Sequence, residues 1–215
     1  KPRAVDNAPT VQADAIGSGS AYFNGSNDDY IDCGSIDFGT SDFSMVAWYN
    51  ADSNVDYSSI VSNKDNSSPN SGTQIRVRGS DLELLSRIDS VNFEDAKTTL
   101  PSLNEWVHVA GTVDRSGSQN LYVNGVLVGT DDISAKSSDS LTSADNFRIG
   151  SNESTYGFDG NIAQVGIWMG VLTQEKIQSV MEKTFEELTA TEKSSLGAEL
   201  WDEDARTGTV TTGWS

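Results

Sequence analysis

Three arginines stand close together in a sequence that has few basic residues. The 215-residue chain has 14 Lys and Arg against 32 Asp and Glu, a formal net charge of −18. Arg76 and Arg78 alternate with Ile75 and Val77, the period-two pattern of a half-buried strand, so both arginines are expected on one face. Together with Arg87 they would form a local positive spot able to hydrogen-bond a ligand. Salt bridges to nearby acids are the favoured interpretation of these arginines, and the free positive spot is the alternative.

Composition argues against several classes of protein. Nucleic-acid binding needs clustered Lys and Arg, and here acidic charge exceeds basic charge more than twofold. The single Cys33 cannot form an internal disulfide, and one Cys with one His argues against a zinc site built from Cys and His. No apolar run reaches the roughly 18 residues of a transmembrane helix. We therefore expect no membrane insertion, and the acidic charge balance leads us to expect no nucleic-acid partner.

Short β-type runs dominate the chain from Ala21 onward. They are separated by Gly, Asn, Asp and Ser, a pattern typical of an antiparallel sandwich. Asn124-Gly125, between two apolar runs, predicts a two-residue hairpin. Helical spacing is expected only late, over 174–181 after Thr173 as N-cap, and a capping box at 189–192 predicts a second short helix.

These patterns predict one domain. Residues 1–20 are small and polar and are expected to form an N-terminal arm or a first irregular strand. The domain is then expected over 21–215, with a helical segment at 172–196 and a closing strand or tail at 198–215.

Seven sequence blocks follow one another in order between residues 21 and 182. Among them, 104–110 reads N-E-W-V-H-V-A and 121–129 reads L-Y-V-N-G-V-L-V-G; the others lie at 21–31, 43–48, 148–150, 158–168 and 172–177. Together they resemble the laminin-G-like, concanavalin A-like lectin–glucanase jelly-roll domains of bacterial or phage type. This resemblance implies an all-β fold, a two-sheet antiparallel jelly-roll sandwich with one or two short C-terminal helices.

The resemblance also implies where a ligand would bind. Members of the family bind glycans, proteins or calcium-bridged ligands, on the loops at one rim or in a groove on a sheet. A glycan groove needs exposed aromatic rings with amides and charged groups that hydrogen-bond hydroxyls. The candidate ligand-binding residues of these types are Tyr49, Tyr57, Asn63, Lys64, Asp65, Arg76, Arg78, Arg87 and Tyr156.

Calcium is a candidate ion but is not expected from the motif. The family pattern G-x-i-D-e carries acids that support a metal in some members, and Ala163 and Gln164 stand at those places here. The acidic cluster at 27–32 could supply oxygen ligands, although a solvated loop in an acidic protein is the favoured interpretation. No cofactor and no metal site are therefore predicted.

Catalysis is not expected. Hydrolases of this fold use E-x-D-x-E or E-x-D-x-x-E strand motifs, which set two carboxyl groups at the separation that glycoside cleavage requires. Neither motif occurs in the sequence. We expect Glu83 to be a lone carboxylate on its strand face and His108 to be structural, since no G-x-S-x-G motif accompanies it.

The favoured function is a non-enzymatic, surface-displayed binding or adhesion module whose partner is a glycan or a cell-surface polysaccharide. The alternative is a structural decoration, fibre or appendage protein of a phage virion or surface assembly, with capsid or tail proteins as partners. A glycoside hydrolase ranks third. Either leading hypothesis implies an extracellular or virion-surface location and allows a homo-oligomer.

Overall fold

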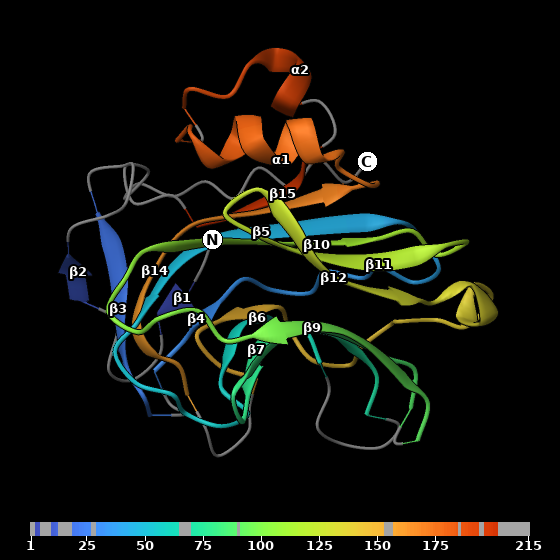
Figure 1. Ribbon diagram of the computed structural model, residues 1–215, viewed down its shortest axis with the longest axis horizontal. Helices are drawn as coiled ribbons and strands as arrows, with labels where there is room; N and C mark the ends of the chain where they lie inside the picture. Colours follow the sequence, from blue (N-terminus) through green and yellow to red (C-terminus); the bar gives the residue numbers. More distant parts are fainter. Residues whose placement is uncertain are drawn as a thin grey trace.

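Two antiparallel sheets stacked face to face make up the protein (Figure 1). The computed structural model describes residues 3–4, 10–12, 19–26, 29–64, 70–89, 91–152, 157–184, 186–193 and 196–201. The strand pairs within this part of the chain are all antiparallel. The all-β two-sheet sandwich predicted from the sequence is confirmed.

One sheet, called sheet A here, has seven strands and lies lowest in Figure 1. Its strands follow the order β1 (Arg3–Ala4), β4 (Ile31–Asp32), β13 (Arg148–Ile149), β6 (Ser59–Ser62), β7 (Gly72–Arg78), β8 (Asp81–Arg87) and β9 (Phe93–Thr99).

The other sheet, sheet B, has eight strands. Its order is β12 (Val126–Asp132), β11 (Ser118–Val123), β10 (Val107–Val113), β5 (Phe43–Ala51), β14 (Asp159–Met169), β3 (Ser20–Asn24) and β2 (Thr10–Gln12), with β15 (Leu196–Trp201) paired to β14. The region expected as an arm thus contributes one short strand to each sheet, and a strand near the C-terminal end of the described chain joins sheet B.

The core lies between the sheets and follows from strand alternation. In β5 the apolar residues at every second position, from Phe43 to Ala51, face sheet A. Sheet A contributes Ile75, Leu82 and Leu84 to the same core, and all three are fully buried. Apolar burial of this extent is the main stabilising contribution of such a sandwich.

Tyr49 belongs to this core. Its side chain is 2% exposed, and its ring meets the edge of Phe158 at 6.2 Å between centroids. Burial raises the pKa of its hydroxyl well above the ordinary value. The prediction that Tyr49 contacts a ligand is therefore wrong, because β5 turns this residue inward rather than toward solvent.

The predicted hairpin is present between β11 and β12. Asn124 and Gly125 have φ values of 49° and 72°, as a two-residue turn with both central residues left-handed requires. Sequence patterns did not predict β9, whose exposed and polar residues alternate around one buried side chain, Ala96. This edge strand lies against β12, where a Cβ at Gly129 would be 2.6 Å from the carbonyl oxygen of Lys97.

Two short helices cover the outer face of sheet B, the face turned away from sheet A (Figure 1). Helix α1 (Gln174–Met181) begins after Thr173, whose hydroxyl accepts from the Lys176 amide at 3.4 Å. Helix α2 (Ala190–Lys193) has the predicted capping box, with Thr189 N–H to Glu192 at 2.7 Å and the return bond at 3.2 Å. No helix in the described residues is long and apolar enough to cross a membrane.

His108 is buried beneath this helical cover. Its side chain is 1% exposed and its ring meets that of Trp48 edge-on at 5.4 Å. The Trp48 indole N–H donates to the Met181 carbonyl at the end of α1 at 3.0 Å. Desolvation lowers the pKa of His108 to about 3, so the imidazole stays neutral in the folded protein.

Acid should therefore destabilise the protein through His108. Above pH 6.5, the ordinary pKa of the group, both folded and unfolded states carry a neutral imidazole. Between pH 6.5 and pH 3 only the unfolded state binds the proton. The free energy of unfolding should then fall by about 1.4 kcal/mol per pH unit from this group.

Urea unfolding at a series of pH values tests this, with His108→Leu as the comparison. His108 is the single histidine of the chain, so the difference in slope between wild type and variant isolates it. Equal slopes below pH 6.5 would show that the imidazole is protonated in the folded state as well.

Candidate functional site

The β7–β8 hairpin sets two oppositely charged side chains beside each other on the outer face of sheet A, the face turned away from sheet B. Arg78 and Asp81 are cross-strand partners on either side of Gly79-Ser80. Gly79 has a φ of 58°, and Ser80 is not left-handed, as a type II′ hairpin turn requires. Because directly opposed residues of an antiparallel pair point to the same face, this turn fixes Arg78 and Asp81 on one side.

Side chains from the segment before β6 hold the turn in place. The Asp56 carboxylate accepts from the Gly79 amide at 2.7 Å, and the Asn54 amide donates to the Gly79 carbonyl at 2.7 Å. Tyr57 follows Asp56 in a left-handed conformation, with a φ of 64°. The turn and the 54–57 segment are thereby fixed against each other.

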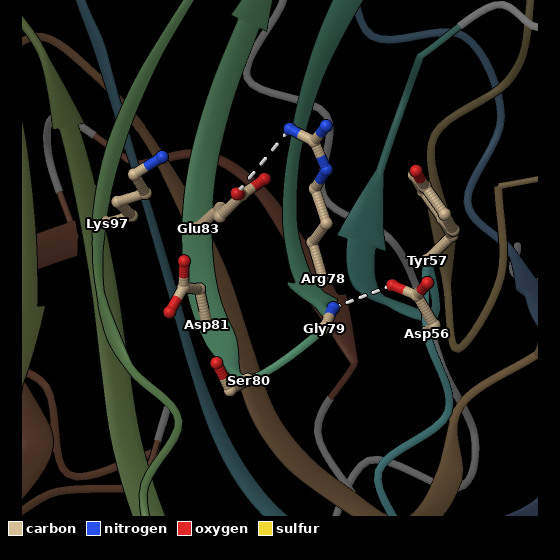
Figure 2. A pocket seen from close by; sticks show the side chains of 8 residues that line it. All are labelled: Asp56, Tyr57, Arg78, Gly79, Ser80, Asp81, Glu83 and Lys97. Atoms are coloured by element: carbon tan, nitrogen blue, oxygen red, sulfur yellow. Dashed lines mark hydrogen bonds and ion pairs between the residues drawn. The ribbon is translucent and has the colours of Figure 1, made fainter.

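An open cleft of about 400 Å³ lies between these elements. Figure 2 shows Glu83 between Arg78 and Lys97, with Tyr57 and Asp56 across from them on a separate segment. The volume falls within the range of small-molecule sites. The cleft is lined by Asp56, Tyr57, Arg78, Gly79, Ser80, Asp81, Glu83 and Lys97.

A buried ion pair borders the cleft: Glu83 lines it, and Arg76 holds Glu83 without lining the cleft itself. Arg76 Nε and Nη2 both approach Glu83 Oε2 at 2.9 Å, and the two side chains are 7% and 2% exposed. Arg78 adds a looser contact to the other oxygen, Oε1, at 3.8 Å. The arginines do share one face, as predicted, but Arg76 serves Glu83 and does not form a free positive spot.

Arg78 and Tyr57 form the exposed part of the site. The Arg78 side chain is 42% exposed and its guanidinium carbon lies 5.9 Å from the centre of the Tyr57 ring, which is itself part of a residue 40% exposed. A hydrogen bond to Tyr57 is the main cause that raises the pKa of Arg78. A ring and a forked donor are thus presented together to solvent.

Arg87 lies on the same face but does not line the cleft. Its guanidinium carbon stands 5.3 Å from the centre of the Phe93 ring, and its Nε donates to the Asp89 carbonyl at 2.9 Å. Burial lowers its pKa, and the nearby Arg76 contributes in the same direction. Its prediction as a ligand contact is not supported by this position.

The remaining predicted residues lie apart from the cleft. Asn63 is buried, donating to the Ile36 carbonyl at 3.1 Å and accepting from the Thr73 amide at 2.9 Å, so it ties strand β7 to the segment that follows β4. Lys64 is 5% exposed. Asp65 and Tyr156 lie outside the described residues. Burial thus removes Asn63 and Lys64 from the exposed surface that a ligand would meet.

Of the eight residues that line the cleft, only Tyr57 and Arg78 were predicted as ligand contacts, and the charged residues missed are Asp56, Asp81, Glu83 and Lys97. The expectation that Glu83 is a lone carboxylate is wrong, because Asp81 stands two residues earlier on the same face. The D-x-E spacing in strand β8 was the available signal. Lys97 faces Glu83 across β8 and β9, and nothing in the polar sequence of β9 marked it as a strand.

The acidic cluster considered for calcium is engaged in loop hydrogen bonds where the structure describes it. Asp29 accepts from the Asn24 amide at 3.0 Å, and burial raises its pKa. Asp32 accepts from the Gly34 amide at 2.9 Å. Asn27 and Asp28 lie outside the described residues. In the described part of the chain, no group of three or more His, Cys, Asp or Glu could hold a metal ion.

Solved structures with the same sandwich include domains named for binding. The binding domain of botulinum neurotoxin serotype G superposes with a TM-score of 0.66 at 18% identity, over 84% of this chain and 45% of that one. The ligand-binding domain of serotype D, in complex with N-acetylneuraminic acid, gives 0.64 at 20% identity, over 85% and 45%. This chain therefore spans about half the length of those neurotoxin domains.

A further match is domain 4 of an extracellular arabinanase from Geobacillus stearothermophilus, in complex with arabinotriose. It gives a TM-score of 0.61 at 18% identity and covers 80% of each chain. The two stacked antiparallel sheets define a jelly-roll β-sandwich domain. The sequence profile described as the concanavalin A-like lectin/glucanases superfamily (Laminin_G_3) matches residues 23–178, and the chain belongs to this family. No curated protein sequence matches significantly.

Replacing one partner of the Arg76–Glu83 pair should lower the free energy of unfolding strongly, whereas replacing both partners by apolar residues should lower it little. Glu83→Leu leaves the Arg76 charge buried without its partner and should lower the free energy of unfolding by about 3–5 kcal/mol. The double variant Arg76→Met with Glu83→Leu should recover most of that loss. Chemical denaturation of the two single variants and the double variant completes the cycle; a double variant as unstable as Glu83→Leu would contradict the pairing.

Proposed function

We propose that this domain is a non-enzymatic module that binds glycan through the cleft on the outer face of sheet A. The observation that carries the proposal is the exposed Tyr57 ring beside the Arg78 guanidinium. Carboxylates line the same cleft. Sugar rings offer apolar faces and many hydroxyls, so an aromatic surface next to paired donors and acceptors suits them. Surface recognition or adhesion is the role we propose for such binding.

The similar structures support this class of ligand. One was solved with arabinotriose and another with N-acetylneuraminic acid, both sugars. The arabinanase that contains the first of these domains is described as extracellular. We propose the same setting for this domain, outside the cell and facing polysaccharide or glycoconjugates.

Binding is favoured over hydrolysis because of what surrounds Glu83. A glycoside hydrolase needs two carboxyl groups free to act on one bond. Although Asp81 and Glu83 share a face, Glu83 is 1% exposed and its oxygens are contacted by Arg76 and Arg78. A carboxylate held in this way is engaged by the arginines and is not available to a substrate.

The virion hypothesis is not carried forward. None of the similar structures described above is a capsid, fibre or tail protein. No feature of the cleft favours viral partners over a glycan.

Removing either exposed cleft group should weaken glycan binding. Tyr57→Ala and Arg78→Ala should each raise the Kd for a bound oligosaccharide at least tenfold, about 1.4 kcal/mol, because each loses a contact surface that solvent reaches. A glycan array followed by calorimetry with the strongest ligand measures this. Lys176→Ala, on α1 at the opposite side of the sandwich, is the control and should leave the Kd unchanged.

Thermal unfolding of all three variants shows whether the fold is intact. If no glycan on a broad array binds the wild-type protein, the proposed function is wrong. Binding that survives both cleft variants would place the site elsewhere on the molecule.

A further inference from the structure

The charges that line the cleft nearly cancel. Three carboxylates, from Asp56, Asp81 and Glu83, face two cations, Arg78 and Lys97. Arg76, which does not line the cleft, neutralises Glu83 at 2.9 Å. Lys97 is paired with Asp95 at 3.7 Å. With these two neighbours included, carboxylates outnumber cations by one, and no cation stands in the cleft without a carboxylate close by.

Asp56 is the more exposed carboxylate of the cleft, but Asp81 is the one whose two oxygens are both unengaged. The residue is half-buried at the cleft wall, and its side chain makes no hydrogen bond or ion pair with another described residue. Glu83, by contrast, is held by Arg76, and one oxygen of Asp56 is held by the Gly79 amide. A ligand that enters beside Arg78 thus meets an unshared acceptor directly across the hairpin.

An acidic ligand would be repelled both by the nearby carboxylate of Asp81 and by the net negative charge of the whole chain. Close by, its carboxylate or sulfate would lie near Asp81, and like charges a few ångströms apart disfavour each other. Farther away, the net charge of −18 opposes the approach of any anion. An uncharged sugar avoids both penalties, and each hydroxyl can donate to a carboxylate and accept from a guanidinium.

The fold alone does not decide between these ligand types. The two similar domains were solved with an acidic sugar and with an uncharged one. The cleft of this chain has its own charge pattern, which identifies the type.

We propose that the cleft selects uncharged oligosaccharides, with Asp81 accepting from one sugar hydroxyl while Arg78 donates to a neighbouring one. This inference rests on the proposed function, glycan binding at the same cleft. Asp81 is then the residue that determines specificity, since it both holds a hydroxyl and excludes anionic sugars.

Matched ligands test the proposal without changing the protein. Oligogalacturonate and its fully methyl-esterified form have the same backbone and differ in charge, as do sialyllactose and lactose. An array of uncharged, carboxylated and sulfated oligosaccharides, followed by calorimetry on the matched pairs, should show binding confined to uncharged members. Because no ligand charge is involved, the Kd should change less than about twofold between low and high salt.

Asp81→Asn gives the second readout. It should weaken binding of the uncharged ligand about tenfold, while Glu182→Gln, which removes the same charge at the end of α1 on the opposite side of the sandwich, should have no effect. Thermal unfolding of both variants verifies that the fold is retained.

Each outcome decides one question. Preferential binding of the acidic members, strengthened by Asp81→Asn and weakened by salt, would overturn this inference and leave glycan binding in place. Binding of neither class would overturn glycan binding itself. Uncharged ligands that bind equally well to Asp81→Asn would remove Asp81 from the site.

Discussion

The register of β7 against β8 is the constraint on which the site and much of the core depend. The two-residue turn at Gly79-Ser80 sets Arg76 opposite Glu83. A slip by one residue would turn these charges into the core and expose Ile75 and Leu84. The buried ion pair is satisfied only in the observed register, so we interpret it as a device for specifying that register more than as a source of stability.

Much of the fold could be predicted because its signals are local. Asn124-Gly125 requires left-handed backbone, and Thr173 and Glu192 satisfy helix-end amides, so a few neighbouring residues suffice to predict the hairpin and the helices. Strand β5 was harder, because it is apolar on both faces: one meets the core and the other the helices. Its sequence therefore could not show that Tyr49 points inward.

The cleft was only partly predictable, because it is assembled from distant segments. Tyr57 and Arg78 were identified by type, whereas Lys97 lies on β9, an edge strand whose single buried side chain gives no periodic signal. The fate of Arg76 also depended on a cross-strand partner that only the pairing of β7 with β8 defines. Residue type can nominate a binding group, but burial and pairing decide whether it remains available.

The helices over sheet B affect how the domain can present a binding site, because they cover one of its two broad faces. Ile177 and Val180 pack onto the outer face of that sheet, and Trp48 is bonded to the end of α1. The two broad faces of the sandwich are therefore not equivalent, and the cleft lies on the face that α1 does not cover. If the cleft binds glycan as proposed, it presents its ligand in one direction only. Tight attachment to a repetitive polysaccharide would then come from displaying several copies side by side, through avidity and not through a stronger single contact.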